Sequence, residues 1–176
     1  MSLIPRGLGL TRYEADEYYK MALDFYKKGQ FDDAVDHITY AIEALPSRAE
    51  FYATRGFFYL EDGLPEKAKP DFEAALKRFN YELLAHYGLG MIAYKAKQWD
   101  EALAHFQKAY FANQQRPETL YYLALTHHHK RENDKALTYM EQAQAIFEEE
   151  NDRRRTAARQ WVSEFKKRID DETKSE

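Results

Sequence analysis

A repeat of small residues constrains the fold of this chain more than any other feature. Alanines recur every 34 residues in two sets that keep one register: Ala34, Ala68, Ala102 and Ala136, and then Ala41, Ala75, Ala109 and Ala143. Large apolar residues keep the same spacing between the two sets, at Ile38, Phe72, Phe106 and Met140. Self-similarity at this period is typical of stacked helical hairpins, because a single hairpin cannot bury its apolar face alone. The sequence therefore predicts an all-α solenoid.

Further positions in the same register carry a family resemblance. Gly56 and Gly90 share a column with Ala22 and Ala124, and the segment "LAHYGLGMIAYKAKQWDEALAHFQKAY" combines the aromatic, Leu-Gly, Tyr, Ala and Phe positions in one repeat. Divided into blocks 15–48, 49–82, 83–116 and 117–150, the chain resembles the tetratricopeptide repeat (TPR) family. The resemblance implies a right-handed α-solenoid of four TPR helical hairpins plus a C-terminal capping helix.

The segments outside the repeats have distinct compositions. Residues 1–12 contain Pro5, Gly7 and Gly9, which predict a flexible N-terminal segment, with the four repeats over 13–150 and a first helix from Glu14 to Lys28. Residues 151–170 predict a capping helix, followed by a frayed tail at 171–176. The apolar stripe of the predicted capping helix consists of Ala157, Ala158, Trp161, Phe165 and Ile169.

Three repeats depart from the pattern, the second at the start of its second helix and the third and fourth in their turns. Pro65 falls at the expected start of a second helix, where proline is tolerated, whereas Pro70 should remove one early helical hydrogen bond or delay the helix. Gly29 and Gly63 are replaced in the next two repeats by Lys97 and Arg131. We expect those two turns to be less relaxed or differently shaped.

Composition excludes several classes of function. The formal net charge of −4 argues against nucleic-acid binding, which requires a basic face. The absence of cysteine excludes disulfides and thiolate zinc sites. No apolar run is long enough to span a membrane, and the N-terminus does not have the pattern of a secretory signal. We expect a cytoplasmic protein with no membrane partner; the oligomeric state is left open.

No motif in the sequence predicts catalysis, a metal site or a cofactor. The consecutive residues His127, His128 and His129 would point about 100° apart on a helix, so they cannot converge on one ion. His127 falls in a column where the family pattern has a packing tyrosine, which indicates a role in the core. The acidic residues Asp32, Glu66, Asp100 and Asp134 each fall near a helix start, where they complement the helix dipole.

The resemblance implies a binding surface on the concave face, which the first helix of each hairpin lines. The matching positions are rich in tyrosine and apolar residues, and tyrosine is enriched in binding hot spots. The alternative is that some of these rings pack against each other between repeats. The candidate peptide-binding residues are Tyr19, Leu23, Tyr26, Phe57, Tyr87, Met91, Tyr94, Tyr121, Leu125 and His128.

One family function is argued against by the residues present. TPR domains that bind acidic chaperone tails use a clamp of lysine, asparagine and arginine side chains. The matching positions here hold Tyr19, Leu23, Thr54, Leu84 and Gly88. The sequence therefore predicts a protein–protein interaction module or adaptor that holds a peptide segment in an apolar groove. The alternative is a secretion-type chaperone that shields an apolar client segment.

Overall fold

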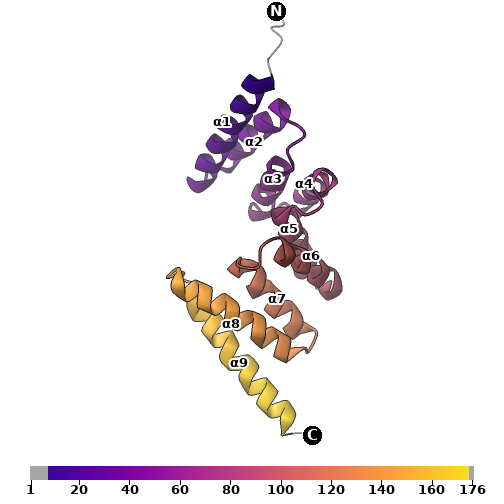
Figure 1. Cartoon of the computed structure of the whole chain (residues 1–176), viewed down its shortest axis with the longest axis vertical. Helices are drawn as coiled ribbons and strands as arrows, with labels where there is room; N and C mark the ends of the chain where they lie inside the picture. The colour runs from indigo at the N-terminus through magenta and orange to yellow at the C-terminus, as the bar shows by residue number, and fades with distance from the viewer. Residues whose placement is uncertain (1–7, 175–176) are drawn as a thin grey trace, which may run out of the picture. The chain divides into compact units, whose positions relative to one another are not determined.

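The computed structural model describes residues 8–174, and within this range every regular element is an α-helix (Figure 1). Consecutive helices form four hairpins, and a last helix follows them. This arrangement confirms the all-α fold of four hairpins plus a capping helix. The helices are α1 (Leu8–Lys27), α2 (Phe31–Ala44), α3 (Ala49–Glu61), α4 (Pro65–Arg78), α5 (Leu83–Lys95), α6 (Trp99–Ala112), α7 (Pro117–His129), α8 (Asn133–Glu149) and α9 (Arg155–Thr173).

The chain consists of two compact units, and the boundary between Gly88 and Leu89 falls within α5. The first unit contains α1 to α4 and the beginning of α5. The second contains the remainder of α5 and α6 to α9. Within the first unit α1 packs against α2, α2 against α3 and α3 against α4; within the second, α6 packs against α7, α7 against α8 and α8 against α9.

The first helix begins earlier than the sequence predicts. It includes Leu8, whereas the expected start was Glu14, and residues 1–7 of the predicted flexible segment lie outside the described residues. Gly9 lies in the first turn of this helix; glycine keeps its backbone N–H, so its cost in a helix is conformational entropy and not a lost hydrogen bond. At the other end, α9 extends to Thr173 and thus includes part of the predicted tail at 171–176, of which residues 175–176 are not described.

The two sets of alanines that recur every 34 residues, called the alanine ladders from here on, mark the sites of closest helix packing. All eight ladder alanines are fully buried, as are the large residues between them. The glycines of the preceding helices fit closely against those large residues. A Cβ atom on Gly56 would lie 2.8 Å from Cε1 of Phe72, and one on Gly90 would lie 2.6 Å from Cε1 of Phe106. Small residues therefore allow the two helices of a hairpin to approach until the large ring fills the space between them.

The four hairpin turns have one backbone conformation. In each turn, a backbone N–H donates to the carbonyl oxygen of the residue five positions earlier in the chain. Gln30 donates to Phe25 at 3.0 Å, and Glu132 donates to His127 at 3.0 Å. The residue before that donor has a positive φ in every turn: 73° at Gly29, 76° at Gly63, 60° at Lys97 and 62° at Arg131. This is a Schellman ending, which glycine adopts at least cost. Of the two outcomes expected for the third and fourth turns, the structure has the less relaxed backbone at Lys97 and Arg131, in a turn of unchanged shape.

The two prolines of the second repeat both lie inside α4. Pro65 is in the first turn, where its missing N–H removes no helical bond. Pro70 lies further along without delaying the helix, which starts at Pro65. The cost of Pro70 is therefore the missing bond, not a late start.

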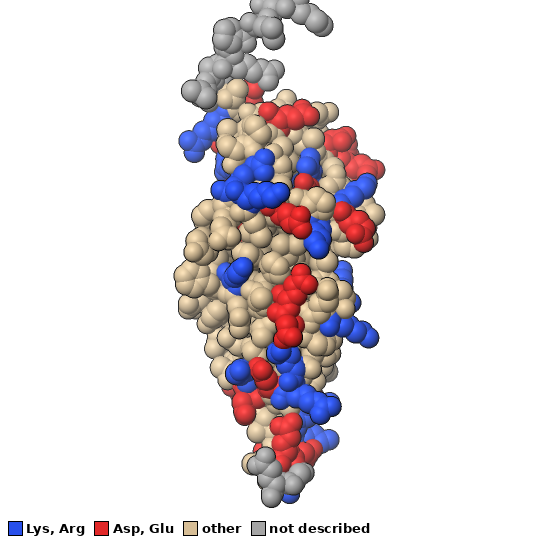
Figure 2. Space-filling view, turned by 90° about the vertical axis from the view of Figure 1, so that its right-hand side faces the viewer, with Lys and Arg blue, Asp and Glu red and all other residues tan. Residues whose placement is uncertain are grey.

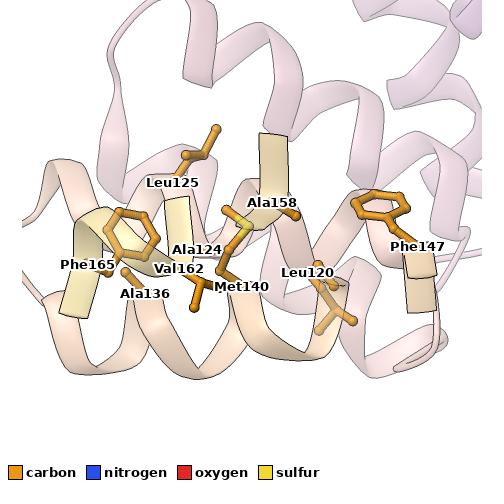
Figure 3. Packing of buried hydrophobic residues seen from close by; sticks show 10 residues of the cluster. Leu120, Ala124, Leu125, Ala136, Met140, Phe147, Ala158, Val162 and Phe165 are labelled. Atoms are coloured by element: carbon orange, nitrogen blue, oxygen red, sulfur yellow. The ribbon is translucent and has the colours of Figure 1, made fainter. Parts of the chain in front are cut away.

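The last helix completes the core of the second unit (Figure 3). Ala158, Val162 and Phe165 of α9 are buried together with Leu120, Met140 and Phe147 of α7 and α8. Trp161, which the sequence places on the apolar stripe, packs at the edge of this cluster and is partly buried. Val162 was not among the expected residues, because the stripe lies slightly further round the helix than predicted.

Candidate protein-binding surfaces

The candidate residues of α1 lie beside α3 in the first unit. The ring of Tyr19 lies 5.2 Å from that of Phe51, and burial raises the pKa of the Tyr19 hydroxyl. Leu23 is half-buried. The ring of Tyr26 stacks on Phe58 with centroids 4.7 Å apart and an interplanar angle of 12°. These α1 side chains therefore use part of their surface to pack on the next repeat.

Phe57 and Tyr87 complete the candidates of the first unit. Phe57 is half-buried, and its ring centroid lies 6.0 Å from that of Tyr26. Tyr87 is buried, with 7% of its surface exposed. Tyr26 and Phe57 thus form a partly exposed aromatic pair, whereas Tyr87 offers little surface to a partner.

Tyr94 is the centre of an aromatic cluster in the second unit. Its ring lies 5.3 Å from Trp99 and 5.4 Å from Tyr122, and its hydroxyl lies 3.2 Å from Nε2 of His129. Burial raises the pKa of Tyr94 to about 12, and the neighbouring tyrosines act in the same direction. Met91, one turn earlier on α5, is half-buried. Tyr94 and Met91 therefore keep part of their surface accessible on a well-packed base.

The candidates of the fourth repeat lie against α9. The indole N–H of Trp161 donates a hydrogen bond of 3.1 Å to the Tyr121 hydroxyl. Leu125 is buried in the α7–α8–α9 core, and the ring of His128 lies 5.0 Å from Phe165. The capping helix thus occupies much of the surface of these three residues, which leaves Tyr121 and His128 half-buried.

Ring contacts link some of the candidates within each unit: Tyr26 with Phe57 in the first, and Tyr94 with Tyr121 through Tyr122 in the second. Several of their ring contacts join the first helices of neighbouring repeats, as in the pairs Tyr19–Phe51, Tyr26–Phe58 and Tyr94–Tyr122. The alternative interpretation, packing between repeats, therefore accounts for part of the surface of these tyrosines.

The three consecutive histidines have three different surroundings. His127 is buried, its ring is stacked 5.5 Å from Tyr139, and its Nδ1–H donates to the Glu132 carboxylate at 2.6 Å. This placement confirms the core role. His128 faces α9, and His129 is stacked on Trp99 with centroids 4.1 Å apart. Among residues 8–174, no group of three or more His, Cys, Asp or Glu side chains is arranged to hold a metal ion.

Sequence reasoning missed a pair of polar clefts in the second unit. One, of about 510 Å³, is lined by Lys97, Gln98, Trp99, Asp100, Glu101, His129 and Lys130. The other, of about 370 Å³, is lined by His128, His129, Arg131, Asn133, Arg168 and Glu172. The signal that could have located them is the presence of Lys97 and Arg131 where the first two repeats have glycine.

The surface charge is mixed. On the face that Figure 2 shows, acidic and basic side chains are interspersed, and neither sign forms an extended field. In the part of the chain that the structure describes, no helix combines the length and apolar character needed to span a bilayer.

Comparison with known proteins identifies the repeat. A family model described as "Tetratricopeptide repeat" matches residues 19–68 and 58–117, which together exceed half of the chain. The chain is 33% identical over 100 residues to the TPR repeat-containing thioredoxin TDX of Arabidopsis thaliana. That match includes 56% of this chain and only 26% of the relative. The thioredoxin activity in that name belongs to the longer protein, and the present chain contains no cysteine.

Solved structures share the fold at low sequence identity. A structure of pilF from Pseudomonas aeruginosa has a TM-score of 0.68 at 19% identity and covers 89% of this chain and 77% of its own. The first TPR of Spaghetti (RPAP3), bound to an HSP90 peptide, has a TM-score of 0.61 at 17% identity, with coverage of 66% and 93%. The family match, the buried alanine ladders and the four hairpins agree. The chain belongs to the tetratricopeptide repeat family, whose domains are protein–protein interaction modules.

Proposed function

We propose that this chain binds a segment of a partner protein along the first helices of its hairpins, through apolar and aromatic anchors. The observation that carries the proposal is the half-burial of five first-helix residues. Each has a packed base and an accessible remainder, as expected of a preformed anchor site. These residues are Leu23, Tyr26 and Phe57 in the first unit, and Met91 and Tyr94 in the second.

Half-burial favours binding for an entropic reason. A side chain that is already held by its neighbours loses little rotamer freedom when a partner covers the rest of it. Tyr26 is held by Phe58, and Tyr94 is held by Trp99 and Tyr122. We assign direct contacts to the half-buried residues, which also include Tyr19, Tyr121 and His128. Tyr87 and Leu125 are buried, so we assign them a supporting role.

The nature of the partner segment follows from the absence of a cationic clamp. The positions that would bind a chaperone's acidic tail hold an aromatic residue, aliphatic residues, a threonine and a glycine. Of these, Thr54 is buried with 4% of its surface exposed, and Gly88 lies against Phe72. We therefore propose a segment anchored by apolar side chains, as distinct from the HSP90 peptide bound by the RPAP3 domain.

The test starts with a partner captured by pull-down and identified by mass spectrometry. Phe57→Ala and Met91→Ala remove one anchor from each unit, and Lys108→Ala removes an exposed side chain of α6 as a control. Loss of a hot-spot anchor should cost about 2 kcal/mol of binding free energy, or a roughly thirtyfold weaker Kd by calorimetry. All variants must first melt like the parent.

Two results would change the assignment. Normal binding by both anchor variants, with loss in Lys108→Ala, would place the working surface on the second helices. A partner that is soluble only when co-expressed with this chain would indicate a secretion-type chaperone in place of an adaptor.

A further inference from the structure

A cleft with acidic walls lies beside the turn of the second hairpin in the first unit. Its volume is about 300 Å³, and it is bounded by the start of α2, the end of α3 and the turn that leads into α4. Three exposed carboxylates line it, those of Asp32, Asp36 and Asp62, and Lys67 is the one cation among its lining residues. Three carboxylates and one ammonium leave a formal charge of −2 in the cleft.

This negative charge is not neutralised by the surroundings. None of the three carboxylates has an ion-pair partner among residues 8–174. The Nζ atom of Lys67 lies over the ring of Tyr59, 5.6 Å from its centroid. The residues directly before and after the lining residues in the sequence add Asp33, Glu61 and Glu66 and no lysine or arginine. The surplus therefore favours a cationic ligand.

The second unit has the same arrangement with a cation already in it. Asp32 and Asp62 recur two repeats later as Asp100 and Lys130, and the Lys130 ammonium donates to the Asp100 carboxylate. Asp62 and Lys130 have nearly the same backbone, with φ −75° and ψ 2° against φ −86° and ψ 3°, and each precedes a residue with positive φ. Asp32 and Asp100 both lie in the first turn of a helix. The first unit thus has a second carboxylate where the second unit has the ammonium that neutralises this position.

The rest of the cleft can accept an aliphatic chain. Phe31, Val35 and Leu64 line it and are half-buried, so each combines a packed side with an accessible one. The side chains of lysine and arginine lay their aliphatic stems along apolar surface and keep the charged end in polar surroundings. Among the described residues, no group of three or more His, Cys, Asp or Glu side chains is arranged to hold a metal ion. The spacing of the carboxylates therefore favours an extended organic cation.

We propose that this cleft binds a lysine or arginine side chain from a basic segment of a partner protein. The aliphatic stem lies along the apolar wall. The charged group reaches Asp32 and Asp62, in the way that the ammonium of Lys130 reaches Asp100 in the second unit. The site goes beyond the apolar anchors proposed for the first helices and does not depend on them.

The test titrates an acetylated, amidated hexalysine peptide into the full chain at low ionic strength. Calorimetry gives the Kd, and NMR follows the backbone amides of Asp62 and Gly63. The decisive variant is Asp62→Lys, which copies Lys130 and supplies the cation from within the chain. A second variant, Asp32→Asn with Asp36→Asn, removes two carboxylates without adding a cation. Both variants change the net charge from −4 to −2, and both should weaken hexalysine binding at least about tenfold.

Controls separate the cleft from the overall charge of the protein. Glu73→Lys makes the same change of net charge at an exposed position of α4 and should bind within about twofold of the parent. Hexalysine acetylated on every side chain should not bind, because acetylation removes the charge. Met91→Ala removes an apolar anchor in the second unit and should leave hexalysine binding unchanged, so that the two proposals can fail separately.

Three results would overturn the proposal, provided that all variants melt like the parent. One is hexalysine binding by Asp62→Lys as tight as that of Glu73→Lys. Another is the absence of any shift of the Asp62 and Gly63 amides on addition of hexalysine. Equal shifts of these amides with magnesium chloride alone would assign the cleft to a metal ion in place of a basic side chain.

Discussion

At the scale of single residues, the size of the ladder alanines sets the distance between helices. Ala68 and Ala102 are fully buried, and the glycines that face the same rings have no space for a Cβ atom. A larger side chain at either alanine must displace a helix or adopt an unfavourable rotamer.

Ala68→Leu or Ala102→Leu should therefore destabilise the fold by about 1–3 kcal/mol through overpacking. Ala145→Leu is the matched control, because Ala145 is exposed on α8. Thermal or urea unfolding of the three variants measures the difference. Equal losses of stability at all three positions would show that the ladders are not the closest contacts.

Residue identity matters in a different way at the turns. Gly29 and Gly63 meet no atom within 4 Å of a hypothetical Cβ, so only the positive φ favours glycine there. The third and fourth turns keep this backbone with Lys97 and Arg131, at a cost of roughly 1–2 kcal/mol each. Local preference alone thus predicts that these turns differ, whereas helix packing on either side holds them in the same shape.

At the scale of elements, α9 is the part whose role depends most on contacts. Phe165 and Ala158 are fully buried against α7 and α8, and the arginines and lysines of α9 lie toward solvent or form ion pairs such as Lys166–Glu141 at 2.8 Å. A helix with one buried stripe and one charged face closes the end of a stack of hairpins.

Truncation after Asn151 should expose Leu125, Met140 and Phe147 together, and so promote self-association. Sedimentation analysis across a concentration series measures this effect. Phe165→Ala is a milder test of the same contact, with an expected loss of about 3–5 kcal/mol. A truncated chain that remains monomeric and melts like the parent would show that α9 does not cap the core.

At the scale of the whole molecule, the first hairpin differs from its successors on one face. Glu17, which pairs with Lys20 at 2.7 Å, is partly exposed. The positions that follow it by one, two and three repeats, Phe51, Ala85 and Thr119, are fully buried. At this column the first hairpin is therefore polar where the later hairpins are buried, whereas Met21 on the same helix is an exposed apolar residue.

Replacing the polar side chains of α1 with aromatic ones should create a surface through which the protein self-associates. Glu17→Phe with Asp24→Phe copies Phe51 and Phe58 of the second hairpin onto α1. We expect concentration-dependent association in size-exclusion chromatography with light scattering, because the added rings form an exposed apolar patch. Glu73→Phe with Lys77→Phe, at exposed positions of α4, adds the same number of rings as a control. Equal association of both variants would assign the effect to general hydrophobicity.

The sequence by itself determined the repeat period, the hairpins and the positions of closest packing, because residue size and helix signals recur within each 34-residue block. Ala34, Phe72 and His127 lie where their columns predict. Tertiary structure alone decided how much of each first-helix side chain faces solvent. The hydrogen bond from Trp161 to Tyr121 spans 40 residues, and the stack of Trp99 on His129 joins two repeats. Exposure and clefts depend on such distant neighbours, so a residue's place within its own repeat cannot specify them.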